Sequence, residues 1–283
     1  MKPIYGIDVT TDKKNKIYSG SEFITKTNSA QQIESFNSKQ EKLDKTIANS
    51  KLPTWLRIIE FFCGISFLII IGVLIKASES FEEMLRNDLN LIIIGVISGL
   101  IALTLHFYAT KKENKVLEEQ NADQQFENIN ENIQNMYDSL NVPDTATSVD
   151  ILLFRYIIKN DKIVVKSKML PPTSHVNVEV KIYINDEYLC FADVENIFSF
   201  KLSELKAIRT INKRIIIPSW NKDSSPMHGE FKQYKLGVTY IGTIIVKPYH
   251  ILEIERNGTL YGIYFPCYEL ATFEALTGLK AES

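Results

Sequence analysis

Two long stretches without a formal charge constrain this chain of 283 residues more than any other feature. Phe61 to Ile75 reads FFCGISFLIIIGVLI, and Leu91 to Thr110 reads LIIIGVISGLIALTLHFYAT. A helix rises about 1.5 Å per residue, so either stretch, the first extended back to Trp55, can cross a hydrocarbon core of about 30 Å. We predict two membrane spans, over about residues 55–75 and 91–110. The alternative is a buried helical hairpin inside a soluble protein.

Basic residues flank the predicted hairpin of spans, whereas its connection is acidic. The connection from Lys76 to Asp88 holds more carboxylates than basic groups. Positive charge accumulates on the cytoplasmic side of membrane proteins, so we predict a multi-pass protein of the cell (inner) membrane with both termini in the cytoplasm. The basic residues that support this orientation are Lys45, Lys51 and Arg57 before the first span, and Lys111, Lys112 and Lys115 after the second.

The second span contains Gly95 and Gly99, a GxxxG spacing that predicts close helix packing. The partner is either the first span, with Gly64 and Gly72 on one face, or another copy of the chain. Pairing within the hairpin is the interpretation we favour. The ionisable side chains of Glu60 and His106 lie close to the cytoplasmic edge, where Arg57 could pair with Glu60, which argues against an ion pathway.

Helical arms flank the spans on the cytoplasmic side. Residues 1–53 form an N-terminal arm in which 29–50 reads as a polar helix. Residues 54–110 are the hairpin, and 111–148 read as a helical stalk and linker. The stalk carries an apolar stripe with heptad-like spacing, which fits either a short coiled coil or packing against the first arm. The stripe consists of Ala122, Phe126, Ile129, Ile133, Met136 and Leu140.

From 149 to 283 the pattern changes to short β-rich runs separated by turns. Asn257-Gly258 between two apolar runs favours a tight hairpin turn, because both positions tolerate positive φ. After Pro266 a short helix presents Leu270, Phe273 and Leu276 on one face and ends at Gly278. We predict an α+β protein with a C-terminal antiparallel barrel or sandwich that this helix caps. The predicted strands are 151–158, 163–168, 176–184, 188–192, 197–202, 208–217, 234–240, 243–246, 250–255 and 260–265.

Two segments of this region resemble bacterial pleckstrin-homology-like domains. They are Tyr261–Leu270 (YGIYFPCYEL), which enters the last helix, and Phe200–Ile208 (FKLSELKAI), which precedes the strand toward Trp220. The resemblance covers about residues 150–280 and implies a domain that binds acidic lipid headgroups, peptides or proteins. Lipid-binding members use basic residues around the first hairpin, a region that here holds Lys159, Lys162, Lys166 and Lys168.

A second group of basic residues follows in the chain and completes a possible positive face. Such a face would attract an anionic leaflet, at about 1 kcal/mol for each basic residue near the surface. The alternative is a set of solvated strand edges, where lysine also discourages aggregation. This group consists of Lys206, Arg209, Lys213 and Arg214.

The sequence holds no recognisable catalytic, nucleotide-binding or metal-binding motif. Its net charge is almost zero, which gives no indication of nucleic-acid binding. Three cysteines without motif spacing fit a reducing compartment rather than a disulfide framework. We predict a non-enzymatic adaptor or sensor without a cofactor or metal, bound to the bilayer and to a lipid headgroup, peptide or protein. The alternative is an oligomeric membrane effector or pore-forming protein whose spans join subunits and which the cytosolic domain gates.

Overall fold

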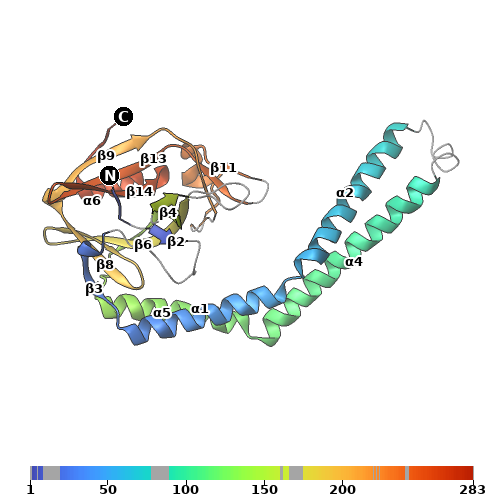
Figure 1. Ribbon diagram of the computed structural model, residues 1–283, viewed down its shortest axis with the longest axis horizontal. Coiled ribbons are helices and arrows are strands. Elements are labelled where there is room, and N and C mark those ends of the chain that lie inside the picture. Colours follow the sequence, from blue (N-terminus) through green and yellow to red (C-terminus); the bar gives the residue numbers. More distant parts are fainter. Residues whose placement is uncertain are drawn as a thin grey trace. The chain divides into compact units, whose positions relative to one another are not determined.

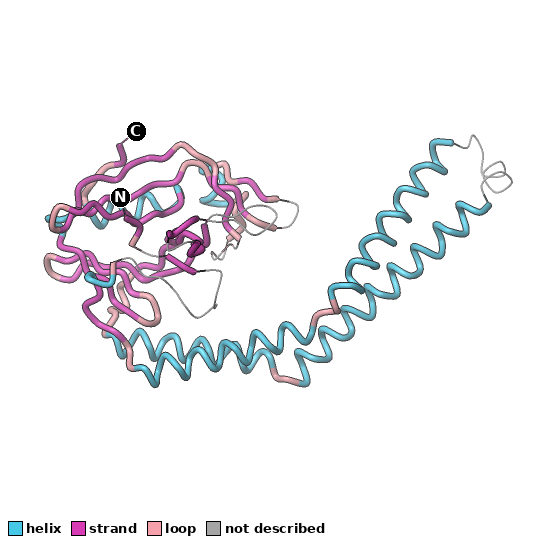
Figure 2. Tube along the Cα trace, in the orientation of Figure 1, coloured by secondary structure: helices cyan, strands magenta, loops and turns pink. Residues whose placement is uncertain are grey.

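A computed structural model describes residues 2–4, 6–8, 20–77, 89–159, 162–165, 175–218, 220, 222, 224–239 and 242–282. The chain divides into two compact units. The helical unit is Gln31–Ile133, and the β unit combines Met1–Ala30 with Gln134–Ser283. Figures 1 and 2 show the helices and strands of both units.

Helix ends in the helical unit follow from local backbone chemistry. Pro53 directly precedes α2, which suits a residue that lacks a backbone donor. Between α4 and α5, Asn121 has a φ of 49° and interrupts the helix. The acidic connection between the predicted spans, 78–88, lies outside the described residues. The helices are α1 (Ala30–Ser50), α2 (Thr54–Ala77), α4 (Leu89–Glu119) and α5 (Ala122–Leu140).

Helices α1 and α5 run alongside each other (Figure 1), with Gln125 Nε2 of α5 donating to Thr46 Oγ1 of α1 at 3.5 Å. Phe36 and Leu43 are the buried apolar residues of α1. Most of the predicted stripe on α5 is buried or half-buried, but Phe126 is 46% exposed. Leu140, at the end of the stripe, packs with Tyr183 and Cys190 of the β unit, so the stripe is not a continuous coiled-coil seam.

Helices α2 and α4 pack against each other through the GxxxG pair. Gly95 and Gly99 are buried, and a Cβ atom added to either would lie within 2.9 Å of Ile70 or Phe67 on α2. Both glycines thus lie in the contact between the two helices of the hairpin. Gly64 and Gly72 have open space where a Cβ would stand.

The β unit contains one large sheet and one small sheet. Its strands are β1 (Lys2–Pro3), β2 (Gly6–Asp8), β3 (Ile24–Thr27), β4 (Thr147–Lys159), β5 (Lys162–Val165), β6 (His175–Asn185), β7 (Tyr188–Ala192), β8 (Asn196–Lys201), β9 (Leu205–Ile211), β10 (Ile215–Ile217), β11 (Gly237–Val238), β12 (Ile244–Val246), β13 (Tyr249–Arg256), β14 (Thr259–Pro266) and β15 (Ala281–Glu282).

The large sheet does not close, so the prediction of a barrel is not supported. Its order is β15-β9-β13-β14-β4-β6-β7-β8-β3, and no pairing joins its two ends in the described chain. The sheet is also mixed rather than antiparallel, because β1 pairs with β14, β2 with β4 and β15 with β9 in parallel. Strands β1, β2 and β15 come from the two ends of the sequence. Each has only two or three residues, which is too short to predict as a strand from the sequence.

The small sheet has the order β10-β12-β11 and differs from its prediction. The sequence predicts a strand over 234–240. Instead, a 3₁₀ helix occupies Gly229–Tyr234, and β11 consists of Gly237–Val238 alone. Lys235 has a φ of 50°, a left-handed conformation that separates the two elements.

The C-terminal elements match their sequence pattern closely. Asn257 and Gly258 both have positive φ between β13 and β14, as the predicted tight turn requires. Helix α6 (Leu270–Thr277) ends at Gly278, whose φ is 71°. The Phe273 ring stacks on that of Phe265 at 3.8 Å. Since Phe273 is fully buried, α6 closes the main core of the β unit.

The N-terminal residues belong to the β unit rather than to a separate arm. Phe23 is the last residue of a 3₁₀ turn (Ser21–Phe23) and is fully buried. Its ring lies 4.7 Å from that of Phe200 and 4.9 Å from that of Tyr261. The predicted boundary at 53 therefore differs from the compact units, because β1, β2 and β3 complete a sheet formed mainly by residues after 147.

Candidate functional site

Helices α2 and α4 are long and apolar enough to cross a membrane. Only 6% of the most apolar segment of α2 and 11% of that of α4 is buried inside the protein. Phe61, Leu68 and Phe107 are each more than 60% exposed. Apolar surface of this extent requires a nonaqueous environment or a partner.

One end of the hairpin carries polar groups next to this apolar surface. Glu60 Oε1 on α2 lies 3.3 Å from Nδ1 of His106 on α4, so Glu60 contacts the opposite helix rather than Arg57. One turn beyond His106, Thr110 Oγ1 donates to the His106 carbonyl. Glu60 and His106 stand equally far from the middle of the connection 78–88. This symmetry is the sequence signal that could have predicted their contact.

A groove of about 750 Å³ runs along α2 and α4 over this polar end. Gly64, Phe67 and Gly99 line its apolar part, where the glycines leave room between the helices. Its polar part is lined by Arg57, Glu60, His106, Thr110 and Glu113. The groove is thus polar at the end of the hairpin and apolar toward its middle.

Two of the predicted basic residues lie on β9 and are neutralised by β13. Lys206 Nζ is 3.1 Å from Glu255, and Arg209 Nε is 2.8 Å from Glu253. Lys213 and Arg214 are exposed in the loop between β9 and β10, and neither has an ion pair in the described structure. Of the four predicted basic residues between 206 and 214, those without a carboxylate partner are therefore the two in the loop, Lys213 and Arg214.

The first predicted hairpin places two lysines opposite each other. The backbone register pairs Lys159 of β4 with Lys162 of β5. Lys166 and Lys168 lie outside the described residues.

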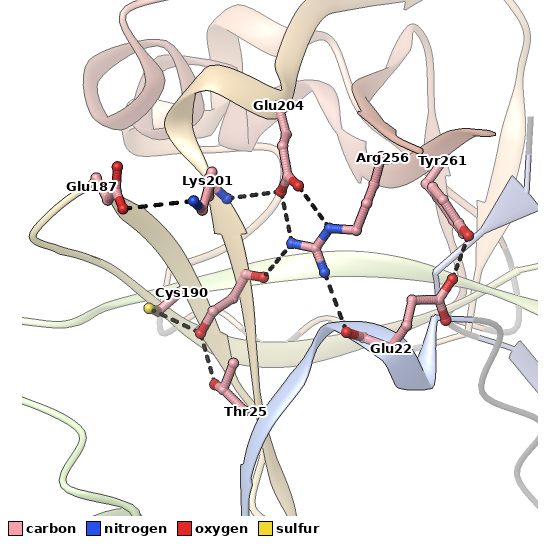
Figure 3. Close-up of polar contacts among 9 residues, drawn as sticks. Glu22, Thr25, Glu187, Cys190, Lys201, Glu204, Arg256 and Tyr261 are labelled. Atoms are coloured by element: carbon pink, nitrogen blue, oxygen red, sulfur yellow. Dashed lines mark hydrogen bonds and ion pairs between the residues drawn. The ribbon is translucent and has the colours of Figure 1, made fainter. Parts of the chain in front are cut away.

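Arg256 connects the N-terminal segment to the main sheet, as Figure 3 shows. Its Nε and Nη2 donate to the two carboxylate oxygens of Glu204 at 2.7 Å each. Nη1 donates to the carbonyl of Glu22, and the guanidinium lies over the Phe23 ring at 3.9 Å. Tyr261 donates its hydroxyl hydrogen bond to the Glu22 carboxylate. This cluster is structural, and no local sequence pattern indicates it because its members are distant in the chain.

A second polar cluster joins β4, the 3₁₀ turn Cys267–Glu269 that precedes α6, and Lys222 in the segment after β10. Tyr268 donates to the fully buried Asp150 at 2.7 Å, and Lys222 lies 2.6 Å from Glu269. Burial raises the pKa of Glu269, and the nearby Lys222 opposes that increase. Burial and the Asp150 carboxylate raise the pKa of Tyr268. Each group has a partner within the cluster, so the arrangement stabilises the fold.

No group of three or more His, Cys, Asp or Glu within the described residues is placed to hold a metal ion. Cys63, Cys190 and Cys267 are free thiols, and burial raises the pKa of Cys267 to about 11. No known protein family, curated protein or solved structure matches this chain. A function can therefore be inferred from the apolar hairpin, the exposed cations and the groove.

Proposed function

We propose that this chain is a non-enzymatic membrane protein, anchored by α2 and α4, whose β unit recognises anionic lipid headgroups from the cytoplasmic side. The observation that carries the proposal is the outward exposure of apolar side chains along both helices. A bilayer supplies the environment that such surfaces need. The basic residues beside the hairpin support a cytoplasmic location for both termini.

The exposed cations of the β unit support an anionic ligand. Lys213 and Arg214 are exposed and form no ion pair with any described residue, and the backbone register pairs Lys159 with Lys162. The bilayer is the most abundant anionic surface within reach of a tethered domain, and basic residues near it each contribute about 1 kcal/mol. The resemblance to pleckstrin-homology-like domains agrees with this ligand class. A peptide or protein ligand, the other class of this resemblance, is an outcome of the test below.

Capture of the reconstituted full chain by vesicles tests the proposal. The chain is placed in nanodiscs of phosphatidylcholine and mixed with vesicles of phosphatidylcholine or phosphatidylglycerol. We expect capture by the anionic vesicles and a roughly thirtyfold weaker affinity after removal of Lys213 and Arg214, because two contacts of about 1 kcal/mol are lost. Lys159→Ala with Lys162→Ala is expected to weaken capture similarly.

The matched control removes Lys201 and Lys206, whose charges pair with Glu187 and Glu255. This control subtracts the same charge from the protein and is expected to retain capture. Equal capture by neutral and anionic vesicles would contradict headgroup recognition and leave a peptide or protein as the ligand. Equal losses in the control and the test variants would contradict the location of the site.

The alternative of an oligomeric effector or pore receives less support. It assigns Gly95 and Gly99 to contacts between subunits, yet these glycines pack on Ile70 and Phe67 of the same chain. A pore also needs polar groups deep in the bilayer, whereas Glu60 and His106 lie near one end of the hairpin. The tethered binding protein is therefore the function that the geometry supports best.

A further inference from the structure

We propose that the groove between α2 and α4 is a binding site for one phospholipid with a primary ammonium headgroup, that is, phosphatidylethanolamine. The proposal rests on the membrane location of the hairpin stated above. It adds a specific lipid site that is separate from the cations of the β unit. Four observations on the helical unit support it. They are the size of the groove, its polarity, the depth at which its polar groups lie along the hairpin, and the charges of those groups.

The groove has the polarity of an amphiphile. Its volume of about 750 Å³ holds a headgroup, the glycerol region and the upper part of an acyl chain. Gly64 and Gly99 form part of the apolar lining, and a Cβ at Gly64 would meet no atom within 4 Å. The space beside Gly64 is therefore open to a lipid chain rather than filled by the protein.

The depth of the polar groups matches the headgroup end of a lipid. Trp55 is 61% exposed near the start of α2, a position typical of the membrane interface. Glu60 follows five residues later, about 7 Å deeper along the helix. Side chains of a helix point toward its N-terminus, so the Glu60 carboxylate extends back toward the interface. A ligand group at the interface can therefore reach this carboxylate.

The charges of the polar end fit a zwitterion. Arg57 provides one cation, and Glu60 and Glu113 provide two carboxylates along the same groove. The lipid phosphate is placed at Arg57, and the ammonium donates hydrogen bonds to Glu60. The side chain of Glu60 is 26% exposed, which leaves oxygen surface beside its contact with His106. Phosphatidylcholine carries the same charges but no N–H donor, and phosphatidylglycerol has no cation.

Native mass spectrometry of the full chain ejected from nanodiscs tests this site. The nanodiscs contain equal parts of phosphatidylethanolamine, phosphatidylcholine and phosphatidylglycerol. We expect one retained lipid per chain. Phosphatidylethanolamine is expected to be favoured about tenfold over phosphatidylcholine, because one charge-assisted hydrogen bond strengthens binding by about this factor. Glu60→Gln is expected to remove this preference, because a neutral amide lacks the charge that strengthens the bond.

Gly64→Leu fills the apolar part of the groove and is expected to reduce retention of every lipid. Gly72→Leu is its matched control, because Gly72 also has an open Cβ position but does not line the groove. Equal retention of the three lipids by the wild type, preferred retention of phosphatidylglycerol, or an unchanged preference in Glu60→Gln would overturn the proposal. A chain that is soluble without detergent would instead overturn the membrane location on which the proposal rests.

Discussion

Arg256 shows at the scale of single residues how distant parts of the chain are joined. Its bidentate pair with Glu204 is largely buried, at 21% and 17% side-chain exposure. The hydrogen bonds from Arg256 hold the pKa of the Glu204 carboxyl below its ordinary value. The same guanidinium fixes the Glu22 backbone and covers Phe23. The N-terminal segment is therefore held by interactions that a single arginine organises.

His175 gives the β unit a defined sensitivity to acid. It is 6% exposed, and burial lowers its pKa from 6.5 to about 4. Between these values the unfolded chain binds the proton and the folded chain does not. Stability therefore falls as the pH decreases from 6.5 to 4, by about 3 kcal/mol in full.

We predict that His175→Gln removes this part of the pH dependence. Thermal unfolding of the full chain in detergent, followed by near-ultraviolet circular dichroism at pH 7 and pH 4.5, measures it. The wild type is expected to lose more stability than the variant between these pH values. An equal loss in both proteins would show that the His175 side chain is not the group responsible.

Close packing of two helices is the main feature at the scale of elements. Gly99 allows the Phe67 ring to approach the α4 backbone, and Gly95 does the same for Ile70. In the proposed bilayer, lipid would remove the hydrophobic driving force between the helices, so this close backbone approach would provide much of the contact energy. The hairpin therefore depends on the absence of side chains at these two positions.

Gly99→Leu is expected to destabilise the hairpin by roughly 1–3 kcal/mol, because its Cβ would lie 2.8 Å from Phe67. The apparent melting temperature of the full chain in detergent, read by size-exclusion chromatography after heating, measures the effect. Gly72→Leu is the control and is expected to melt as the wild type does. Equal melting of the two variants would contradict the packing described for Gly99.

Elements with strong local patterns could be predicted from the sequence. Residues 188–192 form a short run next to a turn, and they form β7 as expected. Asn257 and Gly258 both have the positive φ that the predicted tight turn requires. By contrast, β1 and β15 have two residues each, and their pairing depends on distant strands. The groove likewise depends on how α2 meets α4, which a single helix pattern does not contain.

The charge pattern alone could not predict which basic residues lack a partner. Lys206 and Lys213 look equivalent in the sequence, yet the antiparallel register of β9 and β13 allows Lys206 to meet Glu255. Lys213 stands beyond β9 and has no such neighbour in the described structure. Tertiary pairing therefore decides which part of the predicted basic face is available to a ligand.

At the scale of the whole molecule, the helical unit is inserted within the sequence of the β unit. Residues 1–30 and 134–283 form one compact body on either side of it in the sequence. A fragment that begins at 149 would lack β3, Phe23 and Ile4, the last two of which are fully buried in the main core. Binding experiments on the β unit therefore require the full chain.

The proposed function requires that α2 and α4 are embedded in a bilayer. Alkaline carbonate extraction of membranes from cells that express the full chain tests it most directly, because this treatment releases peripheral proteins and leaves embedded ones. The exposed apolar helices predict that the protein remains in the membrane pellet until detergent is added. Recovery of a folded, soluble full chain without detergent would contradict the account.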